Sequence, residues 1–140
     1  MVDWLTYHTV SMFFTALLLG GMVFFGFFMT PLAFSRLERE IAAAFLRAVF
    51  PIYYQVMAVL GVLAAVPIWY RNEAVVLAGV AVIFVFVKML LLPPINRARD
   101  ARDMGDAAGE ARFKRLHRVS VLINMAQMIA VAAVFFRLAA

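Results

Sequence analysis

The sequence contains no cysteine, which excludes disulfide bonds, thiolate metal sites and cysteine nucleophiles. Charged residues are also scarce: they make up 15% of the chain, against 66% hydrophobic residues, which is far from the balance of a soluble domain. With 140 residues, the chain is long enough for one compact domain. A water-soluble fold of this size could not bury so much apolar surface, so the composition predicts a membrane protein.

Carboxylates are missing from the interior of the apolar segments, because all eight acidic residues lie in loops or at segment ends. The sequence also has no HExxH metal motif, no glycine-rich phosphate loop and no serine-histidine-acid set. Proton-driven transport through a buried carboxylate is therefore disfavoured. The residues favour a protein that is not an enzyme.

Long apolar runs account for the hydrophobic excess. They predict membrane spans at about residues 4–29, 48–70, 74–92 and 118–137. Each run is close to the roughly 20 residues that a helix needs to cross about 30 Å of hydrocarbon. We therefore predict an all-α fold in which residues 1–140 form a single antiparallel four-helix bundle within a lipid bilayer. The small size of this bundle is compatible with a homo-oligomer.

A proline pair follows the third run. Pro93-Pro94 should end this span, because the second proline forces the residue before it out of helical geometry.

Basic residues are concentrated in two of the three predicted loops. The loop between the first two spans carries Arg36, Arg39 and Arg47. The loop between the last two carries Arg97, Arg99, Arg102, Arg112, Lys114, Arg115 and Arg118. The opposite side has only Arg71 and Arg137. Because lysine and arginine stay in cytoplasmic loops, we predict an inner (plasma) membrane protein with both termini outside the cytoplasm. The net charge of +5 then requires no nucleic-acid partner.

Polar residues recur on one face of the fourth span. His117, Ser120, Asn124 and Gln127 follow one another at intervals of three, four and three residues, which places all four on one helical face. Polar groups are costly in lipid and should face the bundle interior. Alternatively, Asn124 and Gln127 serve as hydrogen-bonding contacts between helices.

A polar layer is predicted from the depth of three residues in their spans. Gln55, Lys88 and Asn124 each lie about 10–12 Å from the cytoplasmic ends of their helices, at 1.5 Å per residue. We predict that they form one layer, with Lys88 directed into the bundle near Asn124. Tyr54 should lie nearby. The mouth of the resulting cavity should carry His117, Arg47 and Arg118. The alternative for Lys88 is that its ammonium group snorkels to the interface.

Nine methionines raise the hypothesis of a soft metal ion, because thioethers suit copper(I). His8, Met89 and Met125 are the weak metal candidates. Methionine is also an ordinary filler of irregular cores, and a histidine at the membrane edge often only forms a hydrogen bond. His8 and His117 lie near opposite membrane surfaces, so they cannot both ligate one haem within a monomer.

Two segments carry most of a family resemblance: the Phe-Pro-x-Tyr segment at 50–53 and the Arg-x-His-x-x-Ser-x-x-x-Asn segment at 115–124. Together with residues 21–25 and 88–97, they resemble the transmembrane protein 205-like family in order and spacing over nearly the whole chain. The resemblance implies a four-span membrane protein without established biochemistry. The position that matches Lys88 resembles asparagine in that family, so the resemblance implies no role for this lysine.

A second resemblance is to membrane protoporphyrinogen oxidases of the HemJ type. Those small four-span proteins have a histidine early in the first span and a lysine in the third, and His8 and Lys88 occupy comparable places. The tryptophan-rich signature of their first span is missing here.

These observations lead to one function and its alternatives. We expect a transmembrane protein 205-like membrane protein whose cytoplasm-facing polar cavity binds or passes a small ligand or soft metal ion. The alternative is a protein that binds haem or porphyrin, or a HemJ-like oxidase, with haem as its cofactor. A purely structural subunit of a larger complex is the third hypothesis.

Overall fold

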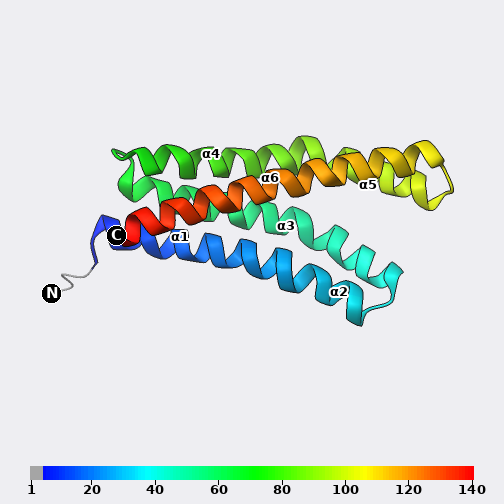
Figure 1. The fold of residues 1–140 in the computed structure, drawn as a ribbon, viewed down its shortest axis with the longest axis horizontal. Helices are drawn as coiled ribbons and strands as arrows, with labels where there is room; N and C mark the ends of the chain where they lie inside the picture. The colour runs from blue at the N-terminus through cyan, green and yellow to red at the C-terminus, as the bar shows by residue number, and fades with distance from the viewer. Residues whose placement is uncertain (1–4) are drawn as a thin grey trace.

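The computed structural model describes residues 5–140, and over these residues the chain is all helical. The helices in chain order are α1 (Tyr7–Val23), η1 (Phe24–Met29), α2 (Thr30–Arg36), α3 (Arg39–Ala65), η2 (Val66–Ile68), α4 (Asn72–Phe86), η3 (Val87–Leu91), α5 (Leu92–Asp103) and α6 (Ala107–Ala139). They join into four long apolar rods that are each long enough to cross a membrane. The predicted all-α, four-helix membrane architecture is confirmed (Figure 1). The predicted start of the first span, residue 4, lies outside the described residues.

The rods run antiparallel, so the molecule has two distinct ends (Figure 1). The termini end holds the start of α1, the end of α6 and the turn at residues 69–71. The basic end holds the α2–α3 connection at residues 37–38 and the α5–α6 turn at residues 104–106. Gly105 adopts a φ of 87° in that turn, a backbone conformation that glycine tolerates best.

Small residues allow the rods to pack closely. A Cβ atom added at Gly61 on α3 would lie 3.0 Å from the Cβ of Ala81 on α4. At the basic end, a Cβ added at Gly109 on α6 would lie 2.6 Å from the Cβ of Ala101 on α5. Such contacts are typical of helix association in membranes, where close backbone approach replaces the hydrophobic driving force.

We expect Gly109→Ala to destabilise the protein by about 1–3 kcal/mol, because overpacking at a close contact forces the backbones apart. The closest atoms, on Ala101 and Arg102, belong to a short side chain and the backbone, so they have little freedom to yield. Gly79→Ala is the matched control, since an added Cβ there meets nothing within 4 Å. Thermal unfolding in detergent measures both variants. Equal melting temperatures for the two variants would contradict this packing argument.

The prolines do not end the third rod, contrary to the sequence-based prediction. The helix continues past Pro93 and Pro94 to Asp103, because η3 is a π-helical turn that places both prolines in the first turn of α5. There, proline needs no hydrogen-bond acceptor for its missing N–H. The N–H of Leu92 instead reaches the carbonyl of Val87, five residues back.

The first rod repeats this arrangement. The N–H of Thr30 donates to the carbonyl of Phe25, also five residues back, and the Thr30 hydroxyl donates to the same carbonyl at 3.0 Å. Pro31 follows directly. Both odd-numbered rods therefore widen into a π turn just before a proline, and π turns occur frequently at functional sites.

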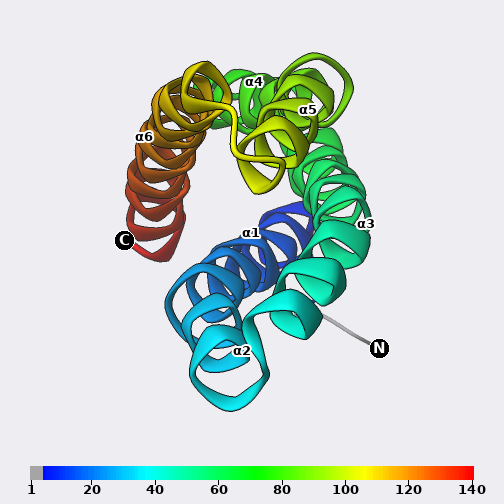
Figure 2. The same cartoon turned by 90° about the vertical axis from the view of Figure 1, so that its right-hand side faces the viewer.

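The rods separate toward the basic end. α1 packs against α6, but beyond the π turns α2 and α3 lie on one side and α5 and α6 on the other (Figures 1 and 2). Figure 2, which views the molecule along the rods from the basic end, shows α2 and α6 well apart.

Candidate functional site

A cavity of about 470 Å³ occupies the basic half of the bundle, where the rods separate. Its walls come from η1, α2, α3, α5 and α6. The lining residues are Phe25, Gly26, Phe27, Thr30, Phe34, Arg39, Ala43, Leu46, Phe50, Tyr53, Tyr54, Leu92, Ile95, Arg99, Arg102, Phe113, His117, Ser120, Val121, Asn124 and Met125. The π turn η1 contributes Phe25, Gly26 and Phe27 to the lining, and η3 ends next to the lining residue Leu92.

The base of the cavity is aromatic. The rings of Phe25 and Tyr53 stack with their centroids 4.2 Å apart, and Phe50 meets Phe25 edge-on at 5.3 Å. The Tyr53 hydroxyl donates to the Oδ1 atom of Asn124 at 3.5 Å, the long limit of a hydrogen bond. This contact places a polar pair between α3 and α6 in the cavity wall.

The rim of the cavity is basic. It consists of Arg39, Arg99, Arg102 and His117, and none of the lining residues is acidic. The guanidinium groups of Arg102 and Arg99 lie over the Phe113 ring, 4.4 Å and 5.3 Å from its centroid. Cation–π attraction therefore holds both groups at the rim. The Phe113 ring also stacks on His117, with centroids 5.6 Å apart.

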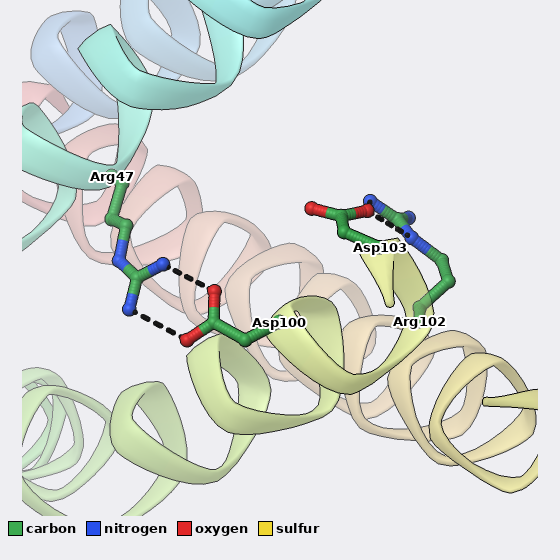
Figure 3. Close-up of polar contacts among 4 residues, drawn as sticks. All are labelled: Arg47, Asp100, Arg102 and Asp103. Atoms are coloured by element: carbon green, nitrogen blue, oxygen red, sulfur yellow. Dashed lines mark hydrogen bonds and ion pairs between the residues drawn. The ribbon is translucent and has the colours of Figure 1, made fainter. Parts of the chain in front are cut away.

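An ion pair joins two walls of the cavity near the rim. Arg47 on α3 donates to both carboxylate oxygens of Asp100 on α5, at 2.6 Å and 3.1 Å (Figure 3). Arg102 contacts the neighbouring Asp103 on its own helix at 3.0 Å (Figure 3). The Arg47 side chain is thus tied to Asp100 and does not line the cavity. Near the mouth, where it was predicted, Arg47 thus forms a bridge between α3 and α5.

The predicted polar layer is divided between two places. Lys88 donates its Nζ proton to the Oε1 atom of Gln55 at 3.0 Å. Both residues line a separate apolar groove between α3 and α4, whereas Asn124 lines the cavity. Tyr54 and Gln55 are adjacent on one helix and so point about 100° apart, which is why only Tyr54 reaches the cavity. The prediction of a single layer, with Lys88 directed toward Asn124, is therefore wrong.

The remaining predicted residues are dispersed. Of the polar face of α6, His117, Ser120 and Asn124 line the cavity. Gln127 is buried and donates to the carbonyl of Val80 on α4 at 3.1 Å, which is a contact between helices. Arg118 is not among the lining residues.

The metal candidates lie in three different places. Met125 lines the cavity, and Met89 lines the apolar groove between α3 and α4. His8 hydrogen-bonds the Leu138 carbonyl at 2.7 Å near the end of α6. Within residues 5–140, no group of three histidine or acidic side chains is placed to hold a metal ion. His8 and His117 are at opposite ends, about 30 Å apart along α6 at 1.5 Å per residue.

Sequence reasoning missed Arg99 and Arg102 as rim residues, together with Tyr53, Phe25 and Phe113. The two arginines were explained by topology alone, although their spacing of three residues places them on one helical face.

A second polar cluster closes the termini end. Glu73 at the start of α4 pairs with Arg71 at 3.3 Å and with Arg137 of α6 at 3.1 Å. Arg71 also lies 3.3 Å from the Nδ1 atom of His8. This cluster ties α1, α4 and α6 together, far from the cavity.

We expect Glu73→Ala to destabilise the protein by about 1.5–3 kcal/mol, the usual range for hydrogen bonds to charged groups. The Glu73 side chain is only 7% exposed, so its two arginine partners lose a buried acceptor. Glu110→Ala is the control, because its pair with Lys114 is exposed and should contribute less than about 0.5 kcal/mol. Similar melting temperatures for both variants would show that the cluster is not stabilising.

Comparison with known proteins gives one match. The family described as a domain of unknown function, DUF4149, matches residues 13–103, which include both π turns, Tyr53 and the rim arginines of α5. No curated protein and no solved structure matches the chain. The transmembrane protein 205-like and HemJ-type resemblances therefore stay predictions. Because the match covers well over half of the residues, the chain belongs to the DUF4149 family.

Proposed function

We propose that this integral membrane protein binds a small ligand in the cavity at its basic end, and that this end faces the cytoplasm. The cavity itself carries the proposal. Its volume of about 470 Å³ falls within the roughly 300–1,000 Å³ of small-molecule sites, which combine mostly apolar walls with a few convergent polar groups. Here the polar groups below the rim are Thr30, Tyr53, Tyr54, Ser120 and Asn124, and those at the rim are basic.

The cytoplasmic orientation of the cavity is inferred from charge. The arginines and lysines of the basic end far outnumber those of the termini end, and such residues are retained in the cytoplasm.

Different ligands would need different side chains of the cavity. A soft metal ion would have to use Met125, the only methionine among the lining residues. A haem would have to use His117 at the rim. Protein purified gently from its native membrane tests the haem alternative, because a Soret absorption band would favour it over the small-ligand proposal.

Thiol labelling tests whether the cavity is an open, hydrated site. The chain has no cysteine, so a single introduced thiol reports alone. Ser120→Cys places it in the cavity wall, and Leu122→Cys, two residues along α6, places it on an outward apolar face that is 62% exposed. We expect a membrane-impermeant maleimide to label Cys at 120 at least about tenfold faster, because the thiolate is the nucleophile and an apolar environment suppresses it.

The side of labelling tests orientation. Labelling at 120 should require access from the cytoplasmic side, as in inside-out membrane vesicles. Equal, slow labelling at both positions would mean that the cavity is filled or closed in the membrane, and would contradict the proposal.

A further inference from the structure

Two cations at the cavity rim have no acidic partner. Over residues 5–140, Arg39 and Arg99 form no ion pair, and no carboxylate lines the cavity. Arg102 has only the neighbouring Asp103, whose side chain is 60% exposed. The rim therefore carries more positive charge than its acidic neighbours neutralise, and a bound anion would offset the excess through charge-assisted hydrogen bonds.

Below the rim, the walls are mostly apolar; the polar lining residues there are Thr30, Tyr53, Tyr54, Ser120 and Asn124. On α5, Ile95 and Leu92 follow Arg99 toward the base, and on α3, Ala43 and Leu46 line the same depth. The distance along the helix axis is about 10 Å from Arg99 to Leu92 and about 16 Å from Phe113 on α6 to Asn124, at 1.5 Å per residue. This depth fits an extended apolar chain and exceeds what an inorganic anion would fill.

We infer that the cavity binds an amphipathic anion, with a phosphate or carboxylate head group at the arginine rim and an alkyl chain directed toward the aromatic base. This inference rests on the proposed function and specifies its ligand class. Arginine suits such a head group, because its planar guanidinium donates two parallel hydrogen bonds to phosphate or carboxylate oxygens. Apolar walls suit the chain, because they remove it from water.

Two sources can supply this chemistry: a soluble single-chain amphiphile from the cytoplasm, or an acidic lipid from the bilayer. Dodecyl phosphate represents the first source, and dioleoyl phosphatidic acid, incorporated into the bilayer, represents the second. Binding of either supports the inference, and their relative affinity identifies the source.

Head-group selectivity is the primary test. The full-length protein in phosphatidylcholine nanodiscs is titrated calorimetrically with dodecyl phosphate, dodecanol or dodecyltrimethylammonium, and the signal of empty nanodiscs is subtracted. We expect dodecyl phosphate to bind about ten- to hundredfold more tightly than dodecanol, the range for a hydrogen bond to a charged group. The difference should shrink as salt increases, because exposed charges are screened.

Arginine substitutions on α5 test whether the rim causes the head-group selectivity. Arg99→Gln should weaken dodecyl phosphate binding about tenfold, the loss of one charge-assisted contact, and leave dodecanol unchanged. Arg97→Gln is the matched control, because it lies on the same helix and outside the cavity lining. If Arg99→Gln does not fold, the head-group series on the wild-type protein still decides the question.

Different results would contradict the anion inference and the proposed binding cavity. Equal affinity for all three head groups, with each amphiphile slowing maleimide labelling of Ser120→Cys, would overturn the anion inference and leave the binding cavity intact. No saturable binding and no slowing of labelling by any of them would overturn both. Loss of dodecyl phosphate affinity in Arg97→Gln and Arg99→Gln alike would also overturn the inference, since it would indicate attraction by net charge alone.

Discussion

A Lys88→Met variant should melt at a higher temperature than the wild-type protein. The backbone of Lys88 lies about 10 Å along the helix from the predicted cytoplasmic end of its span, and its ammonium group lies on an apolar groove with Gln55 as its hydrogen-bond acceptor. A lysine at the centre of a membrane helix costs roughly 2.5–3.5 kcal/mol on the gentlest insertion scale. One hydrogen bond to a neutral side chain in the membrane offsets only about 0.6 kcal/mol. The substitution should therefore stabilise the protein by about 1–2 kcal/mol, allowing for partial hydration near the interface.

The control for this prediction is Gln55→Leu, which keeps Lys88 and removes its acceptor. It should lower the melting temperature, whereas the double variant should resemble Lys88→Met. Because Lys88 lies outside the cavity lining, its replacement should leave maleimide labelling at position 120 unchanged. A neutral or destabilising Lys88→Met substitution would mean that the ammonium reaches the interface at little cost.

A reporter that is active only in the cytoplasm should be active when inserted at Gly105 and silent when fused after Ala140. The effect should be all or none, because each position lies on one side of the membrane. Gly105 tolerates insertion, since it lies in an exposed turn between α5 and α6. The physical reason for the orientation is the retention of basic loops in the cytoplasm.

An insertion after Tyr70, in the turn between the second and third rods, serves as the internal check and should be silent. The reverse pattern at all three positions would place the cavity outside the cytoplasm. It would then also predict maleimide labelling of Ser120→Cys in intact cells, which makes the two experiments independent tests of one orientation.

The fold was predictable from the sequence because each rod contains an apolar run of membrane length, and in lipid such a run has to form a helix. The helix that continues past Pro93 was not predictable from local rules. A residue before a proline disfavours helical geometry. Here a π turn at residues 87–91 allows the helix to continue. No residue pattern at 87–91 indicates a π turn, so the continuation could not be derived from the sequence.

The site was predictable only where one helix determines the geometry. The spacing of His117, Ser120 and Asn124 places them together on α6, and all three line the cavity. To predict which residues of different rods meet, one must know how each helix is rotated about its axis. Equal depth in the membrane does not give this rotation. Gln55 and Lys88 therefore share a depth with Asn124 but face a different groove.

The two π turns also give the cavity a mechanical property. Each interrupts the regular bonding of its rod at the base of the cavity, and the prolines that follow remove further N–H donors. A bend at η1 would carry α2 with it, and a bend at η3 would carry α5, with Arg99 and Arg102, together with the part of α6 packed against it. α5 is about 18 Å long, so a bend of about 10° at its π turn would move its tip by about 3 Å. The aperture could thus widen or narrow while the packing of the termini end stayed fixed.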